Sequence, residues 1–179
     1  MSRIQPLDPE KTQGKVKELL ATIKAKSGRV PNIFKTMAHS STALQAYLGF
    51  SGAFADAKLS AKVREQIALA VGEDNQCQYC LSAHSAIGKL AGLTPEEIES
   101  GRRAKSADPK TNAILKLAKK LSSNRGNITD AELAEARKAG CSDEEVLEII
   151  AAVALNIFTN YINHVADTAV DFPQAPPLS

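Results

Sequence analysis

The sequence predicts an all-α protein, and three features support this. Alanine occurs 28 times among the 179 residues. No stretch alternates apolar and polar residues with the β-branched side chains that strands favour. Helix start signals recur along the whole chain. The composition, 44% hydrophobic and 23% charged, is that of an ordinary globular protein. A chain of this length can bury one sizeable core, so we expect a single all-α domain over 1–179.

Residues that cap helices divide the first half of the chain. Asp8 and Pro9 can cap and open a first helix that ends near Gly28, because Asp accepts hydrogen bonds from free helix amides and Pro suits the first helical position. Later starts have the same form and are expected at Pro31, at Ser40 or Ser41 (a helix to about 56) and at Ser60 (a helix over about 61–73). A further helix is expected from about 76 to about 92.

Capping boxes mark the helices of the second half. In this motif a Ser or Thr side chain and a Glu three residues later satisfy each other's backbone amides. The boxes are Thr94–Glu97, Thr129–Glu132 and Ser142–Glu145. Asp108-Pro109 opens another helix, to about 122, and the last box starts a long apolar helix that should end near Val170. The segment "PQAPPLS" is expected to be a frayed tail. The helices over 108–170 should pack on a motif core at about 28–94 or lie at a subunit interface.

Charge and targeting signals narrow the class of protein. The net charge of +2 and the scarcity of aromatic residues give no case for nucleic acid as a partner. The N-terminus shows no apolar signal segment, and an odd number of cysteines does not suit a secreted disulfide framework, so we expect a cytoplasmic protein. Residues 149–166 contain no charged side chain apart from a histidine and approach membrane-spanning length. Because Asn156, Asn160, Asn163 and His164 are costly in lipid, we expect a buried or interface helix and no membrane partner.

A cluster of reactive residues occupies the stretch "CQYCLSAH". Cys77 and Cys80 are three residues apart, and His84 follows Cys80 by four. On a helix these steps place all three side chains on one stripe. Residues 72–75, "GEDN", fit a helix break and a new N-cap just before the cluster. Helix N-termini carry partial positive charge that favours thiolates, so the cysteine pair is suited to redox chemistry or to a disulfide.

Glu65 is the expected partner of His84. If one helix ends near Glu73 and the next begins near Gln76, the two form an antiparallel hairpin that carries Cys-x-x-Cys at the start of its second helix. Glu65 and His84 then both lie ~12 Å from the turn, at ~1.5 Å per residue, and so at the same level. Glu65 can orient His84, directly or through one water, and His84 can take the proton of Cys80.

Other interpretations of the cluster stay open from the residues alone. Both cysteines can be inert core thiols. Cys77, Cys80, His84 and Glu65 can also supply four ligands to zinc, although structural zinc sites usually recruit a second Cys/His pair. We expect neither a metal nor a bound cofactor. A thioredoxin-like domain does not fit, because no βαβ pattern surrounds the motif.

The spacing Glu65, eleven residues, Cys77-x-x-Cys80-x-x-x-His84 resembles the alkyl hydroperoxidase D-like branch of the carboxymuconolactone decarboxylase family. The upstream segment "GRVPNIFKTMAHS" looks like one found in the same family, and the resemblance covers about 28–94. It implies an all-α fold, assembled as a homotrimer or homohexamer, and a peroxidase that reduces hydroperoxides. Cys80 would attack the peroxide and Cys77 would resolve the sulfenic acid as a disulfide. An external dithiol, thioredoxin-like or lipoyl, would reduce the pair again.

Two departures and two alternatives accompany this resemblance. The family's best-known peroxidase has a histidine in its proton relay at the position of Tyr79, so here the relay is shorter or Tyr79 takes that place. The namesake decarboxylases lack the cysteine pair. One alternative is an acid/base enzyme of the decarboxylase kind, which acts on a small lactone or acid through His84 and Glu65. The other is a redox-sensing helical oligomer without turnover.

Two further features lie outside the cluster. Asn156, Asn160 and His164 recur at steps of four on an apolar helix, and buried amides need partners. They predict either a hydrogen-bond network between helices or subunits, or a polar border of the active site. Cys141, just before a capping box, is expected to be an inert loop thiol.

Overall fold

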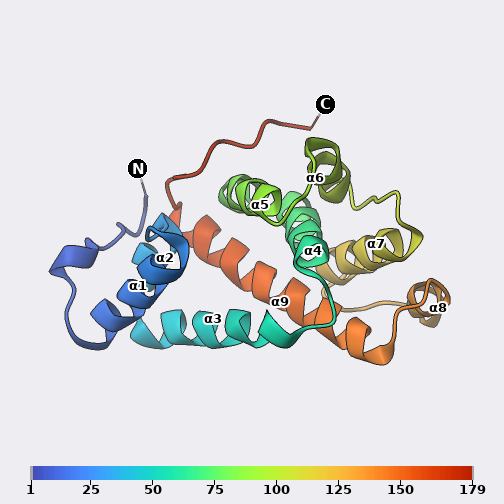
Figure 1. Cartoon of the computed structure of the whole chain (residues 1–179), viewed down its shortest axis with the longest axis horizontal. Coiled ribbons are helices and arrows are strands. Elements are labelled where there is room, and N and C mark those ends of the chain that lie inside the picture. The colour runs from blue at the N-terminus through green and yellow to red at the C-terminus, as the bar shows by residue number, and fades with distance from the viewer. Residues whose placement is uncertain (1, 179) are drawn as a thin grey trace. The chain divides into compact units, whose positions relative to one another are not determined.

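The computed structural model describes residues 2–178, and within that range it is built from helices without a strand. The all-α prediction is therefore confirmed (Figure 1). The described chain groups into two compact units. One runs up to Asp56 and includes Tyr161–Asp171, and the other comprises Ala57–Asn160 and the residues from Phe172 onwards. The expectation of a single domain over 1–179 stays a prediction.

The first unit contains the N-terminal helices. These are η1 (Pro9–Lys11), α1 (Gly14–Ser27), α2 (Asn32–Met37), α3 (Ser41–Ala53) and η2 (Phe54–Asp56). The expected first helix is interrupted, because the Asp8-Pro9 signal opens only one short turn. The Thr12 hydroxyl donates to the Pro9 carbonyl at 2.7 Å, and Gly14 then takes a φ of 56°, which α-helix does not allow. The end is as predicted: Gly28 caps α1 in the left-handed conformation.

Helix α4 (Ala61–Asp74) is the centre of the second unit. It packs against α5 (Gln78–Leu90), α6 (Pro95–Arg102) and α7 (Pro109–Ser123). Seven consecutive residues of α4, from Gln66 to Gly72, are buried, so neighbours cover every face of this helix. Gly101 of α6 allows a close approach, since a Cβ there would lie 3.4 Å from the Gln66 side chain. The predicted start of α4 is correct, with the Ser60 hydroxyl accepting from the Val63 amide.

The three capping boxes predicted from the sequence are all present. In each, the Ser or Thr hydroxyl accepts from the amide of the Glu three residues on, and the Glu carboxylate accepts from the amide of the cap. They begin α6, α8 (Asp130–Lys138) and α9 (Asp143–Ala166). Helix α9 ends at Ala166, four residues before the expected Val170, because Asp167 adopts a left-handed φ of 50°.

Helix α9 is long and apolar enough to cross a membrane by length and composition, and 39% of its most apolar 18-residue window is buried. Core helices of globular proteins pass the same test. Its polar side chains make contacts within the second unit. The Glu148 carboxylate accepts hydrogen bonds from the amides of Lys58 and Leu59, both at 2.9 Å. The helix therefore supplies partners to backbone groups just before α4.

The C-terminal segment is not the frayed tail that its sequence predicts. From Phe172 it runs past α5 towards α6 (Figure 1). The amide of Ala175 donates to the Ser82 hydroxyl at 3.1 Å, and its carbonyl accepts from Gln78 at 2.9 Å. Ala175 is 5% exposed and belongs to an apolar cluster with Leu69, Leu81, Leu93 and Ile98. The proline-rich composition gave no sign of this packing, because the hydrogen-bond partners of the Ala175 backbone are two side chains of α5. Ser179 lies outside the described residues.

We expect Ala175→Glu to destabilise the second unit by a few kcal/mol, because it forces a carboxylate into an apolar cluster. Urea unfolding of the variant and the wild type measures the difference. Glu substituted at the neighbouring exposed Gln174 is the control and should leave the midpoint unchanged. Equal midpoints for Ala175→Glu and the wild type would mean that the segment does not pack as described.

The folded protein should lose stability in acid as the Glu145 carboxylate takes up a proton. Its carboxylate accepts from the Lys110 ammonium at 2.7 Å and from the Ser142 amide, and these hydrogen bonds lower the pKa of Glu145 below its ordinary value of 4.5. A lowered folded-state pKa stabilises the fold above pH 4.5, and this contribution is lost as the pH falls through the folded-state value. Urea unfolding from pH 7 down to about 3 should show the difference between wild type and Glu145→Gln, on the order of 1 kcal/mol at neutral pH, shrinking in acid. If the difference in unfolding free energy between wild type and Glu145→Gln stays constant with pH, the assignment to Glu145 is wrong.

Candidate active site

The turn between α4 and α5 places the two cysteines at a helix N-terminus. Helix α4 ends at Asp74, and Gln76 then adopts a left-handed φ of 54°. This reverses the chain so that the Cys77 amide donates to the Gly72 carbonyl at 2.8 Å. Cys77 is the N-cap of α5, and its sulfur accepts from the Cys80 amide at 3.3 Å. The break before the cluster is as predicted, although α5 starts two residues later than Gln76.

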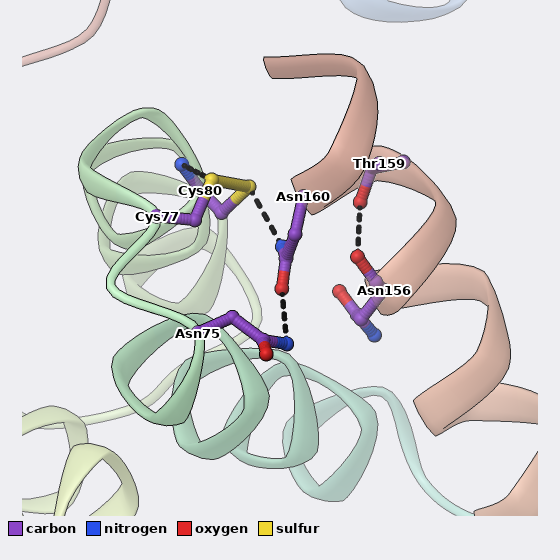
Figure 2. The surroundings of a disulfide bond; sticks show 6 residues. All are labelled: Asn75, Cys77, Cys80, Asn156, Thr159 and Asn160. Carbon is purple, nitrogen blue, oxygen red and sulfur yellow. Dashed lines mark hydrogen bonds between the residues drawn. A yellow bond between two sulfur atoms is a disulfide. The ribbon is translucent and has the colours of Figure 1, made fainter. Parts of the chain in front are cut away.

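Cys77 and Cys80 form a disulfide in this structure (Figure 2). Their Cα atoms lie 5.3 Å apart, within the range that a disulfide spans. Both residues are buried, at 1% and 3% exposure. The first turn of α5 therefore brings the two sulfurs within bonding distance of each other, so the pair has the geometry to exchange two electrons as dithiol and disulfide.

Glu65 and His84 meet as the hairpin geometry predicts. The Oε2 atom of Glu65 lies 2.8 Å from Nδ1 of His84, and both side chains are about four-fifths buried. The contact is direct and needs no bridging water. Gly88, one turn beyond His84, lets the Leu93 side chain pack closely on α5, since a Cβ there would lie 2.9 Å from Leu93 Cδ1. With Nδ1 held by the carboxylate, Nε2 is the ring nitrogen placed to exchange a proton.

The Cys80 sulfur receives its hydrogen bond from a residue outside the expected chain. No hydrogen bond joins it to His84 within residues 2–178. Instead Nδ2 of Asn160, on α9, lies 2.9 Å from the sulfur (Figure 2). Asn160 is completely buried, and its Oδ1 accepts from Nδ2 of Asn75 at 2.8 Å. Asn75 also reaches the Ser122 hydroxyl at 3.4 Å.

The polar stripe of the last helix is therefore only partly at the site. Asn160 contacts the disulfide, whereas Asn156 donates to the Ala152 carbonyl of its own helix at 2.9 Å. His164 is exposed and belongs to the first unit. The i, i+4 spacing flagged Asn160 as a polar residue in an apolar helix, but no sequence signal assigned it to Cys80, eighty residues away.

Tyr79 packs on a different part of α5 from the sulfurs. It is 4% exposed, and its ring meets Phe172 of the C-terminal segment edge to face, with centroids 5.7 Å apart. The ring of Tyr79 thus anchors that segment to α5. Of the expected site residues, the structure joins Cys77 to Cys80 and Glu65 to His84, and it adds Asn160 and Asn75. In the part of the chain that the structure describes, no group of three or more His, Cys, Asp or Glu side chains is arranged to hold a metal ion.

Comparison with known families agrees with the motif. Residues 41–121, which include all four motif residues, match the model of the carboxymuconolactone decarboxylase family. A search of the curated proteins finds no match.

Solved structures share the fold over nearly the whole chain. One is described as an alkylhydroperoxidase AhpD core, an uncharacterized peroxidase-related protein from Ralstonia eutropha JMP134; it is 25% identical, with a TM-score of 0.86 over 95% of this chain and 92% of that one. A peroxidase-related protein from Silicibacter sp. TM1040 is 24% identical, with a TM-score of 0.80 over 93% and 91%. The debrominase Bmp8 in complex with 2,3,4-tribromopyrrole is 19% identical, also with a TM-score of 0.80, over 94% and 91%.

The three thiols should differ in reactivity after reduction. Burial raises the pKa of the Cys141 thiol, so little of it is thiolate at neutral pH. We expect iodoacetamide to modify Cys77 and Cys80 well before Cys141 in the folded, reduced protein, as measured by peptide mass spectrometry over time. In denaturant the three rates should converge, which is the control. Modification of Cys141 first would contradict this assignment.

Proposed function

Because residues 41–121 match the model of the carboxymuconolactone decarboxylase family, we propose that this protein is a thiol peroxidase of the alkyl hydroperoxidase D type. The observation that carries the proposal is the Cys77–Cys80 pair at the N-terminus of α5, with the Glu65–His84 pair on the same hairpin. Named relatives of similar structure are described as peroxidase-related, which supports the same class.

The proposed reaction begins on reduced protein. The Cys80 thiolate attacks one oxygen of a hydroperoxide ROOH, so that an S–O bond forms and the O–O bond breaks. The products are Cys80 sulfenic acid and an alkoxide, which takes up a proton to become ROH. Cys77 then attacks the Cys80 sulfur, and the S–O bond breaks to release water and leave the disulfide. The peroxide gains two electrons, and the two thiols lose them.

His84 handles the protons in this scheme. Its ring accepts the Cys80 proton, directly or through a water, and later returns a proton to the leaving oxygen. Glu65 holds Nδ1 at 2.8 Å, which fixes the orientation of the ring. Both side chains are about four-fifths buried, which limits the access of water to this hydrogen bond.

The remaining parts of the proposal follow from the family resemblance. An external dithiol, thioredoxin-like or lipoyl, reduces the disulfide again, and the reaction takes place in the cytoplasm. The protein works as a homotrimer or homohexamer. Exposed apolar side chains support an oligomer, among them Leu90 at 90% and Leu147 at 67% exposure.

A hydroperoxide titration tests the function. One equivalent of cumene hydroperoxide added to the reduced protein should produce the Cys77–Cys80 disulfide, mapped by peptide mass spectrometry, with Cys141 still reduced. With excess dihydrolipoamide as donor, turnover should be abolished in Cys80→Ser and fall about a hundredfold in His84→Gln, since general acid–base catalysis contributes roughly that much. Glu65→Gln should also lower turnover.

Cys141→Ser is the matched control and should turn over normally. Equal turnover in Cys80→Ser and the wild type would disprove the proposal. Other outcomes point to other chemistry on the same residues. Loss of bromide from a bromopyrrole, with hydroperoxides inert, would match the function named for the structural neighbour Bmp8. Lactone turnover that survives alkylation of both cysteines would indicate an acid/base enzyme. Disulfide formation without turnover with any dithiol would indicate a redox sensor.

A further inference from the structure

The two sulfurs of the pair have hydrogen-bond donors of different origin. Cys77 accepts from the Cys80 amide, within the first turn of α5, so this contact is local to one helix. Cys80 accepts from Nδ2 of Asn160, a side chain on α9, at the shorter distance of 2.9 Å. The donor to Cys80 therefore depends on tertiary structure and can be removed without changing α5.

The orientation of the Asn160 amide is set by a second amide. Oδ1 of Asn160 accepts from Nδ2 of Asn75, the residue at the end of α4, at 2.8 Å (Figure 2). With its oxygen occupied by this donor, the amide can only present its NH₂ group to the sulfur. Asn160 is fully buried, so water does not compete for either contact. The arrangement suits a sulfur that carries negative charge, because a thiolate accepts hydrogen bonds and donates none.

We propose that Asn160, held in place by Asn75, is a positioning residue that stabilises the Cys80 thiolate and so makes Cys80 the attacking sulfur. This inference rests on the proposed function only in taking Cys80 as the nucleophile. A hydrogen bond to a charged group is about twice as strong as one between neutral groups, and burial strengthens it further. The resolving role then falls to Cys77.

A purely structural role for Asn160 predicts a different outcome, so the two can be separated. Stabilising a thiolate increases its fraction at neutral pH but lowers its intrinsic nucleophilicity, with a Brønsted coefficient of about 0.4–0.5. Removing the donor must therefore slow the reaction at neutral pH and leave it as fast, or faster, at high pH. A general loosening of the site changes the rate by a similar factor at every pH.

The experiment measures the alkylation of Cys80 by iodoacetamide against pH. The background variant Cys77→Ser/Cys141→Ser leaves Cys80 as the single thiol, and Ser at the N-cap of α5 preserves an acceptor for the Cys80 amide. Two substitutions are made separately in this background. Asn160→Leu removes the hydrogen-bond donor to Cys80 at similar side-chain volume, and Asn156→Leu is the matched control. Asn156 is also a buried asparagine of α9, one turn earlier, and its side chain donates to a backbone carbonyl.

We expect Asn160→Leu to lower the alkylation rate about three- to tenfold at pH 7 and to move the midpoint of the pH profile upwards, while the high-pH rate is unchanged or higher. Asn156→Leu should leave the midpoint in place. Identical profiles for Asn160→Leu and the background, or a loss of rate by the same factor at all pH values, would overturn the inference.

Two more variants keep the test decisive if Asn160→Leu does not fold. Asn160→Asp retains the acceptor for Asn75 and replaces the donor with a carboxylate, so it should move the midpoint upwards further still. Asn75→Ala removes the anchor and should give part of the shift; combined with Asn160→Leu it should add nothing, because both act through one amide. An unmoved midpoint in both variants would overturn the inference. Iodoacetamide needs no peroxide, so these results stand whether or not the protein reduces hydroperoxides.

Discussion

The antiparallel pairing of α4 and α5 is the constraint on which the rest of the site depends. One left-handed residue, Gln76, reverses the chain, and this turn sets the register of α5 against α4. That register places Cys77 at the helix N-terminus and brings His84 to Glu65. A shift of one residue would turn these side chains about 100° away from each other. The complete burial of α4 from Gln66 to Gly72 holds the register, because any displacement would expose apolar surface or open a cavity.

Polar groups inside the apolar helix α9 are held by partners rather than by solvent. Asn160 is buried between the Asn75 amide and the Cys80 sulfur, and Asn156 uses a carbonyl of its own helix. A buried amide without such partners costs a few kcal/mol. The same desolvation strengthens the contact from Asn160 to the Cys80 sulfur. The amide that would be costly in lipid thus lies against the Cys77–Cys80 pair.

The face of α5 towards the C-terminal segment is built for packing. Gln78 and Ser82 satisfy the backbone of Ala175, and Tyr79 lies against Phe172. One short helix thus serves two purposes. Its cysteines and His84 belong to the candidate active site, and the residues between them hold the C-terminal segment. Cys141 illustrates the contrast, because burial raises the pKa of its thiol, so we expect it to react slowly.

The sequence by itself determined the helices, their caps and the Glu65–His84 pair. These are local: a capping box spans four residues, and the hairpin needs only a turn and the rise of a helix. It did not determine the interruption before Gly14, the end of α9 at Ala166 or the packed C-terminal segment, since each depends on backbone conformation or on partners distant in the chain. Asn160 is the clearest case. Its spacing marked it as polar in an apolar helix, but only the tertiary structure decided that its amide faces Cys80, because a hydrogen bond between residues eighty apart is set by how the helices pack.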